Sequence, residues 1–110
     1  MRNFICLVLL FGPHSIFAST IFVAGEGTLA CGTYLEERRK QDNDSQEYVY
    51  ATWVGGFLTA ANYYFPTKAM RTLPNSATVL AYLDKYCREN PLKLLVNGAV
   101  KLDQDIKADR

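Results

Sequence analysis

The chain has 110 residues, and its 12 Lys and Arg against 11 Asp and Glu give a formal net charge of +1 at pH 7. This balance gives no electrostatic basis for binding nucleic acid or an anionic membrane surface, and we expect neither as a partner. The length fits one small domain, whose hydrophobic core is marginal without covalent support.

Residues 1–18 have the three parts of a secretory signal peptide. Arg2 supplies the positive start, an apolar run follows, and a Gly-Pro pair separates this run from the small residues before a cleavage site. Cleavage after Ala18 is the preferred prediction, and cleavage after Ala24 is the alternative. An uncleaved membrane anchor is disfavoured because the apolar run is shorter than the ~20 residues that a span needs. We therefore expect an exported chain with no membrane span after the signal is removed.

Removal of this signal would also remove Arg2, Cys6 and His14, the single histidine. A chain without histidine has no Ser-His or Cys-His nucleophile pair and no histidine metal site. The paired carboxylates that remain lie in charged, solvated stretches where nothing would separate their pKa values. These carboxylates are Glu36, Glu37, Asp103 and Asp105. We expect no catalytic residue, no metal site and no cofactor.

Cys31 and Cys87 would then be the only cysteines, each within a segment of helical periodicity. A lone cysteine pair in a small exported chain favours a structural disulfide. The spacing is unlike that of a C-x-x-C redox motif. Closing a loop from residue 31 to residue 87 would contribute roughly 4 kcal/mol in the chain-entropy model.

The first segments in chain order are a leader and a short helix. Residues 19–28 have no periodicity and are expected to form a flexible leader. A helix is predicted over residues 29–40, capped by Thr28, with Cys31 and Leu35 on one face. The charged residues at its end are expected to face solvent.

A second helix is predicted over residues 46–65, capped by Asp44 or Ser45. Its main apolar stripe consists of Val49, Trp53, Phe57, Ala60 and Tyr64. A neighbouring stripe consists of Tyr50, Val54, Leu58 and Ala61. A helix apolar over so much of its circumference is normally central and contacted on two sides. Gly55-Gly56 predicts either the close approach of another helix or a kink.

A proline-bracketed loop over residues 66–75 is followed by a third helix to about Glu89, capped by Asn75 or Ser76. Its predicted core residues are Val79, Leu80, Leu83 and Cys87. Asn90-Pro91 predicts the start of a fourth helix, because proline is favoured in the first turn. The residues expected to face the core from this helix are Leu92, Leu95, Val96, Ala99 and Leu102.

The expected fold is therefore all-α, a small four-helix bundle stapled by one disulfide. The helical domain spans residues 29–102, and residues 103–110 are expected to form a charged tail.

Three consecutive aromatic residues close the second helix, and they cannot all face one core. Tyr63, Tyr64 and Phe65 therefore predict a surface patch, together with Met70 and Arg71 of the following loop. An aromatic edge with basic residues suits a protein partner. The alternative is that the loop folds back and covers the aromatic side chains.

Three segments carry a family resemblance: Cys31-Gly32-Thr33-Tyr34-Leu35, Trp53-Val54-Gly55-Gly56-Phe57-Leu58, and Leu83-Asp84-Lys85-Tyr86-Cys87-Arg88-Glu89-Asn90-Pro91-Leu92. Their order resembles the small periplasmic one-disulfide helical proteins of Gram-negative bacteria, chiefly the HdeA/HdeB acid-stress chaperone family. It is also similar in outline to the Tai-type immunity proteins that neutralise toxins of type VI secretion systems. The resemblance covers residues 29–102. It implies a periplasmic location, bridging roles for Cys31 and Cys87, and a central aromatic at Trp53.

The resulting hypothesis is a non-catalytic, HdeA-like periplasmic protein that binds unfolded clients in acid, with a homodimer as a fitting resting state. Without histidine, the acid switch would depend on carboxylates, whose pKa values lie near 4. Fully protonated carboxylates would leave the repulsion of the Lys and Arg side chains to loosen an interface. The alternatives are an immunity protein that neutralises a secreted toxin and a structural subunit of an envelope complex. A carboxylate-dependent enzyme is disfavoured.

Overall fold

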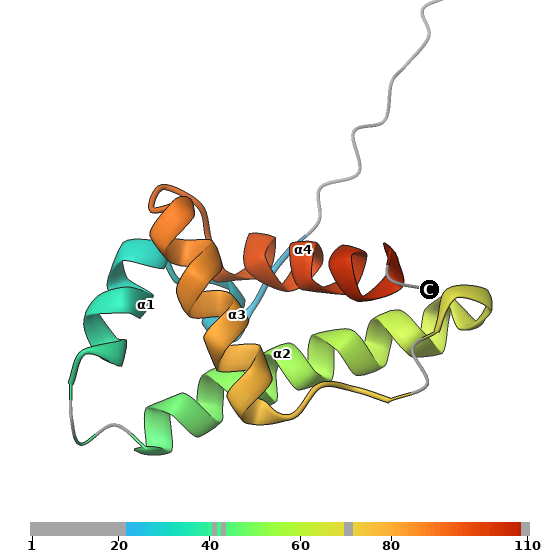
Figure 1. The fold of residues 1–110 in the computed structure, drawn as a ribbon, viewed down its shortest axis with the longest axis horizontal. Helices are drawn as coiled ribbons and strands as arrows, with labels where there is room; N and C mark the ends of the chain where they lie inside the picture. Colours follow the sequence, from blue (N-terminus) through green and yellow to red (C-terminus); the bar gives the residue numbers. More distant parts are fainter. Residues whose placement is uncertain (1–21, 41, 43, 70–71, 109–110) are drawn as a thin grey trace, which may run out of the picture.

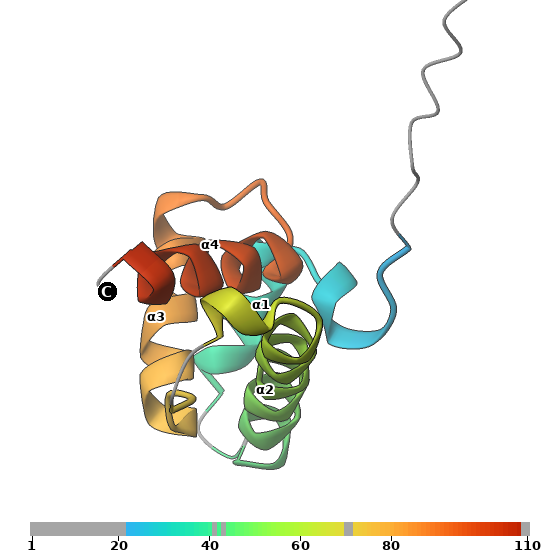
Figure 2. The same ribbon diagram turned by 90° about the vertical axis from the view of Figure 1, so that its right-hand side faces the viewer.

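The structure, a computed structural model, describes residues 22–40, 42, 44–69 and 72–108. These residues form α1 (Cys31–Arg38), α2 (Asp44–Tyr64), α3 (Ser76–Glu89) and α4 (Leu95–Ala108), with the short 3-10 helices η1 (Gly25–Thr28) and η2 (Pro66–Lys68). Figures 1 and 2 show α2 and α3 on opposite sides beneath α4, with α1 at the end away from the C-terminus. The predicted all-α fold of four helices is confirmed.

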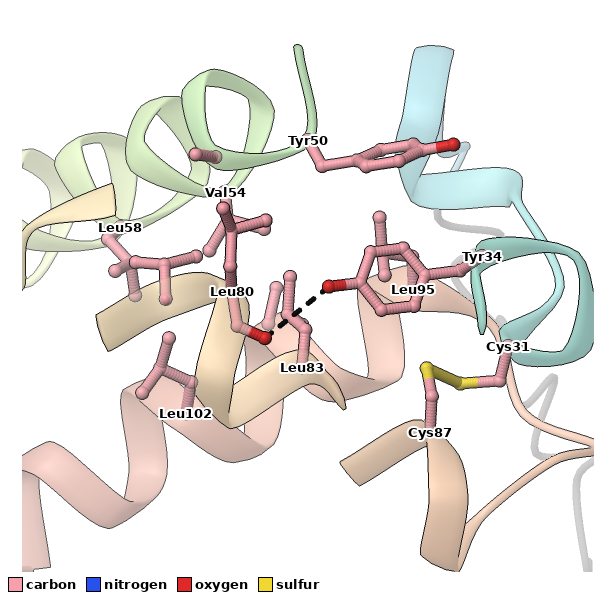
Figure 3. Close-up of a cluster of buried hydrophobic side chains, with 13 residues drawn as sticks. Cys31, Tyr34, Tyr50, Val54, Leu58, Leu80, Leu83, Cys87, Leu95 and Leu102 are labelled. Atoms are coloured by element: carbon pink, nitrogen blue, oxygen red, sulfur yellow. Dashed lines mark hydrogen bonds between the residues drawn. A yellow bond between two sulfur atoms is a disulfide. The ribbon is translucent and has the colours of Figure 1, made fainter. Parts of the chain in front are cut away.

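One hydrophobic core joins the four helices. Its thirteen buried residues are Cys31, Tyr34, Tyr50, Ala51, Val54, Leu58, Val79, Leu80, Leu83, Cys87, Leu95, Ala99 and Leu102. Tyr34 and Tyr50 meet edge-on, with ring centroids 5.1 Å apart, and so join α1 to α2 (Figure 3). Each large side chain buried in this way contributes about 1.5–3 kcal/mol relative to exposure. Tyr34 was not among the residues expected in the core.

The disulfide between Cys31 and Cys87 joins the first residue of α1 to the last turns of α3. The two Cα atoms lie 4.9 Å apart, and both residues are fully buried. The predicted pairing is therefore present. Its bond lies beside the Tyr34 ring at one end of the core (Figure 3).

The third helix follows the sequence pattern closely. Asn75 caps it, because its side chain accepts a hydrogen bond of 2.9 Å from the backbone N–H of Thr78. The four residues predicted to face the core, Val79, Leu80, Leu83 and Cys87, are the buried residues of α3. Its amphipathic pattern is one-sided, so the buried face could be assigned from spacing alone.

On α2 the core uses the second apolar stripe and not the main one. The buried residues of this helix are Tyr50, Ala51, Val54 and Leu58. Val49 and Tyr64, expected in the core, are 39% and 73% exposed. Trp53 and Phe57 lie at the edge of the core and are only partly buried. The prediction of a helix buried on two sides was therefore wrong for these residues.

The close helix approach predicted at Gly55-Gly56 lies elsewhere. A Cβ atom added at either glycine would meet nothing within 4 Å, so no other helix approaches them. At Gly98 of α4 the same added atom would lie 3.0 Å from the side chains of both Leu83 and Tyr86. The small residue that brings two helices together is therefore Gly98, between α3 and α4.

The second half of the predicted flexible leader is folded. Residues Gly25–Thr28 form η1, which packs against Trp53, and the indole nitrogen donates a 2.9 Å hydrogen bond to the carbonyl of Ala24. Gly27 is buried so closely against the ring that an added Cβ would lie 2.2 Å from it. Thr28 bonds the carbonyl of Gly25 and does not cap α1. Residues 19–21 lie outside the described part of the chain, as does the predicted signal peptide.

The fourth helix begins at Leu95, later than the Asn90-Pro91 signal predicted. Hydrogen bonds from the backbone N–H of Cys31 to the carbonyl of Lys93 (2.9 Å) and from the N–H of Leu95 to the carbonyl of Leu29 (2.8 Å) pair residues 93–95 with residues 29–31. Leu92, expected to face the core, is 97% exposed as a result. The tertiary pairing overrides the local proline signal.

This helix also continues through residues 103–108, which were expected to lie in a charged tail. Ile106 packs against the core from this last part. Two i,i+4 ion pairs support the same turns, from Lys101 to Asp105 (2.7 Å) and from Lys107 to Asp103 (2.9 Å). The charged residues thus belong to the last turns of α4, which contact the core through Ile106.

Candidate protein-interaction surface

The side of α2 that faces away from the core is exposed and carries no charge. We call it the α2 outer face, and it consists of Tyr48, Val49, Thr52, Gly56, Thr59, Ala60, Tyr63 and Tyr64. The sequence has no Asp, Glu, Lys or Arg from residue 48 to residue 67. Figure 2 shows α2 at the margin of the molecule, with η1 beside only part of it. The outer face is therefore an uncovered strip of aromatic and small side chains.

The aromatic run predicted as a partner patch is exposed at the C-terminal end of this face. Tyr63, Tyr64 and Phe65 are 79%, 73% and 63% exposed. The rings of Tyr63 and Tyr64 meet edge-on with centroids 5.3 Å apart. The other two predicted patch residues, Met70 and Arg71, lie outside the described residues.

Two shallow apolar grooves border the outer face. The first is lined by Phe57, Ala60, Ala61, Tyr64 and Phe65. The second is lined by Gly25, Glu26, Tyr48, Val49, Thr52 and Trp53. The rings of Trp53 and Phe57 stack between them, with centroids 6.0 Å apart. Both grooves are open depressions rather than enclosed cavities, which favours a polypeptide over a small molecule as ligand.

The main polar cluster ties three helices together. Arg38 of α1 donates two 2.9 Å bonds to the carboxylate of Asp84 on α3 and also pairs with Glu47 of α2. The Tyr34 hydroxyl donates a 2.8 Å bond to the same Asp84. A two-pronged guanidinium–carboxylate pair is both strong and directional. The sequence analysis missed this cluster, because its members are far apart in the chain.

The protonation states of this cluster suit a fixed structural contact. Burial alone would raise the pKa of Asp84, but the hydrogen bonds from Arg38 and Tyr34 outweigh it and hold this pKa below its ordinary value. Burial and the hydrogen bond to Asp84 raise the pKa of Tyr34, so its hydroxyl stays a neutral donor. The cluster therefore holds a carboxylate ionised and provides no group poised to take up a proton near neutrality.

Three of the four carboxylates weighed as acid–base pairs, Glu37, Asp103 and Asp105, are held in ion pairs. Asp103 and Lys107 are only 17% and 19% exposed, and Asp105 accepts hydrogen bonds from both Lys101 and Tyr82. The bond from Lys101, and next that from Tyr82, lower the pKa of Asp105. On α1, Glu37 accepts a 2.9 Å bond from Lys40. Within the described ranges no three His, Cys, Asp or Glu side chains are arranged to hold a metal ion.

The comparison with known proteins assigns no family to the chain. No protein-family model, no curated protein and no solved structure matches it. The resemblance to the HdeA/HdeB and Tai-type proteins therefore stays a prediction. None of the helices within the described ranges has the length and apolar character needed to cross a membrane.

Sequence reasoning found the aromatic end of this surface but missed its extent. The signal that marks the whole outer face is the uncharged stretch of residues 48–67. A solvent-facing helix side normally carries charged residues. The absence of charge on every side of α2 from residue 48 onward therefore distinguishes it from α1, α3 and α4.

Proposed function

We propose that this protein is an exported, non-catalytic domain that binds polypeptides in the periplasm through the α2 outer face. One observation carries the proposal: the eight residues of the α2 outer face are all exposed, and none of them is charged. Soluble monomers seldom expose contiguous apolar patches beyond a few hundred Å², and larger ones mark interaction sites. The centres of protein interfaces are likewise rich in tyrosine and tryptophan and poor in charge.

The proposed ligand is an unfolded client, bound most strongly in acid. The Arg38–Asp84 pair connects α1 to α3, the two helices that carry the cysteines. The Arg38–Glu47 pair connects α1 to α2, which lies between them in the chain. In strong acid, protonation of Asp84 removes its pair with Arg38 and loosens α1 from α3. Because Tyr34 of α1 packs on Tyr50 of α2, this loosening also uncovers the inner face of α2. The disulfide holds the chain together while the inner face of α2 becomes accessible in addition to the outer one. Client binding would thus increase when other proteins unfold.

The test uses reduced, carboxymethylated α-lactalbumin, which stays unfolded, as the client probe at both pH values. Native α-lactalbumin is the folded control at pH 7 only, because it becomes a molten globule in acid. We expect the mature chain to bind the unfolded probe at pH 7 and more tightly at pH 2, where the lowered pKa of Asp84 is approached. Tyr63→Ser combined with Tyr64→Ser should weaken this binding at least about tenfold, because exposed tyrosines are frequent hot spots. Ser and Tyr have similar helix propensities, so the helix itself is little affected.

The matched control is Leu92→Ser, which removes an exposed apolar side chain from the loop before α4. It should bind the probe like the unaltered chain. Equal loss in both variants would show non-specific adhesion and overturn the proposal. Failure to bind the unfolded probe at either pH, together with one tight folded partner at pH 7, would instead favour the immunity-protein alternative.

Export has its own test. When the full chain is produced in a Gram-negative host, we expect the periplasmic fraction to contain a product that begins after residue 18. Intact mass before and after reduction should differ by two hydrogens, because one disulfide opens. A product retained in the cytoplasm with its first 18 residues would contradict the proposal.

A further inference from the structure

All three arginines within the described ranges line a single cleft between α1 and α3. The end of α1 contributes Leu35, Arg38 and Arg39 to the lining, and α3 contributes Asp84 and Arg88. The lysines of the same ranges lie elsewhere. Arginine, unlike lysine, has a rigid fork of donors that matches a carboxylate, so this clustering suits the recognition of one.

Helical spacing places the arginines on the same side of their helices as the other cleft residues. Leu35 and Arg39 are four residues apart at the end of α1, and Asp84 and Arg88 are four apart on α3. Residues with this spacing are neighbours on one helix face. The disulfide and the bonds from Arg38 to Asp84 hold the two helices together, so the walls of the cleft have a fixed separation.

The three guanidinium groups differ in what they already bind. Arg38 donates to both carboxylate oxygens of Asp84 and pairs with Glu47. Arg39 and Arg88 are exposed, and neither has an ion pair or a side-chain hydrogen bond in the part of the chain that the structure describes. Arg88 acts on Asp84 only through its charge. Two guanidinium groups therefore keep their donors available for a ligand.

The charge and the apolar wall of the cleft favour a carboxylate. The lining has three cations against the single carboxylate of Asp84, and the oxygens of that carboxylate are already bonded to Arg38. Leu35 is half-buried and packs against the core, so it gives the cleft an apolar wall. A charge-assisted hydrogen bond is strong, and more so where an apolar wall excludes part of the water.

The position of these arginines at helix ends has a simpler explanation to compare with this one. Cations in the last turn of a helix interact favourably with its macrodipole. Arg38 and Arg88 occupy the last turns of α1 and α3. This effect accounts for one cation on each helix, but it does not account for Arg39, which joins them at the same cleft.

The size and place of the cleft fit one acidic side chain of a longer ligand. Its volume is about 280 Å³. Pockets that hold whole small molecules generally have about 300–1,000 Å³. Arg38 of the lining pairs with Glu47, which directly precedes Tyr48, the first residue of the α2 outer face. A polypeptide on the outer face therefore passes near the cleft at the N-terminal end of α2.

We propose that the cleft between α1 and α3 binds an acidic side chain of the polypeptide ligand, whose carboxylate accepts hydrogen bonds from Arg39 and Arg88. The inference rests on the proposed function and adds to it the class of segment that is bound at neutral pH: an acidic residue beside an apolar one. The apolar neighbour lies against Leu35.

The test compares two forms of one unfolded chain at pH 7. Reduced α-lactalbumin is alkylated on its cysteines either with iodoacetate, which adds carboxylates, or with iodoacetamide, which adds neutral amides of similar size. The unaltered mature chain should bind the carboxymethylated form at least about threefold more tightly, because hydrogen bonds to charged groups are the stronger ones. About 1 M sodium chloride should remove most of this difference.

Arg39→Gln combined with Arg88→Gln should weaken binding of the carboxymethylated form about tenfold and leave less than about a twofold difference between the two forms. The matched control, Lys85→Gln combined with Lys93→Gln, removes the same charge from two exposed residues outside the cleft. It should keep the difference between the two forms. Circular dichroism must show the same helix content in every variant.

A second variant keeps the charge and removes the fork. Arg39→Lys combined with Arg88→Lys should still bind the carboxymethylated form at least about threefold more weakly than the unaltered chain, because lysine is no substitute at a two-pronged site. Full binding by this variant would show general attraction between charges and overturn the defined site.

The outcomes separate this inference from the proposed function. If the glutamine variant keeps the difference between the two forms, or the lysine control loses as much, the inference is overturned and Arg39 and Arg88 are only helix-end cations. The proposed function then stands if Tyr63→Ser with Tyr64→Ser weakens binding. If instead the arginines matter and the two tyrosines do not, the inference is supported and the α2 outer face loses its function. No binding of either form overturns both.

Discussion

The two faces of α2 have similar hydropathy and opposite surroundings. Tyr50, Val54 and Leu58 are buried in the core, whereas Tyr48 and Tyr64 on the other side face solvent. Neither face carries a charged residue from position 48 onward. The inner face is covered because Tyr34 and α3 pack against it, and the outer face is covered by η1 only near Trp53. Hydropathy thus predicts two apolar faces on this helix, but it does not say which of them the core uses.

The largest effect should come from shortening a side chain on the inner face. Leu58→Ala should lower the free energy of unfolding by about 2–5 kcal/mol, because it leaves a cavity in the core. Tyr64→Ala on the outer face should change it by no more than about 0.5 kcal/mol in the monomer. Urea denaturation of the oxidised chain at low concentration measures both. Similar losses from the two variants would show that the faces are equally buried.

The second effect concerns the polar cluster that holds the N-terminal end of the inner face in place. Asp84→Asn should lower the free energy of unfolding by about 1–3 kcal/mol at pH 7, because it leaves the partly buried Arg38 without its charged partner. The pKa of Asp84 is lowered in the folded state, so the contribution is complete above the ordinary aspartate pKa.

This contribution is lost as the pH falls through the lowered folded-state pKa. The difference between the unaltered chain and Asp84→Asn should therefore shrink below about pH 4 and vanish in stronger acid. Urea unfolding at a series of pH values measures it. A difference that stays constant down to pH 2 would show that the Asp84 charge contributes nothing.

The third effect concerns the contact between η1 and Trp53, where η1 covers part of α2. Gly27→Ala should push η1 away from Trp53, because its Cβ would lie 2.2 Å from the indole ring. The expected loss is about 1–3 kcal/mol, as for other overpacked sites. Trp53 is the single tryptophan, so its fluorescence should shift to longer wavelength as the ring meets water. Gly32→Ala, with open space around its Cβ, is the control and should leave the spectrum unchanged.

The smallest effect compares two helical glycines. Gly56→Ala should raise the free energy of unfolding of the monomer by about 0.5–1 kcal/mol, because alanine favours the helix and meets no neighbour. Gly98→Ala should fail to give this gain, since its Cβ would lie 3.0 Å from Leu83 and Tyr86. Equal gains at both sites would show that α3 and α4 can move apart freely. Thermal melts of dilute protein distinguish the two.

The sequence allowed accurate prediction where the cap and the buried face of a helix follow from the spacing of its own residues. The cap of α3 at Asn75 and its buried face follow from local spacing, and the disulfide follows from the count of cysteines in the predicted mature chain. The assignment failed on α2, where two apolar stripes compete and side chains from other helices, Tyr34 among them, decide between the stripes.

Long-range contacts explain the remaining differences. The start of α4 depends on pairing between Leu29 and Leu95, and the order of η1 depends on Trp53. Neither contact has a local signal. The extension of α4 to Ala108 did have one, because Lys101–Asp105 and Asp103–Lys107 are both spaced for helical ion pairs. Of the candidate surface, the aromatic end could be predicted from the sequence. The rest of the α2 outer face could be assigned only once the exposed side of the helix was known.

The position of the disulfide in the chain has a consequence for damage to the protein. All of α2 lies within the covalent ring closed by Cys31 and Cys87, whereas α4 lies outside it. A single proteolytic cut between the cysteines therefore leaves both pieces bonded to each other, and they separate on a gel only after reduction. A cut between Cys87 and α4 leaves that helix without a covalent link to the rest, so it separates on a denaturing gel without reduction.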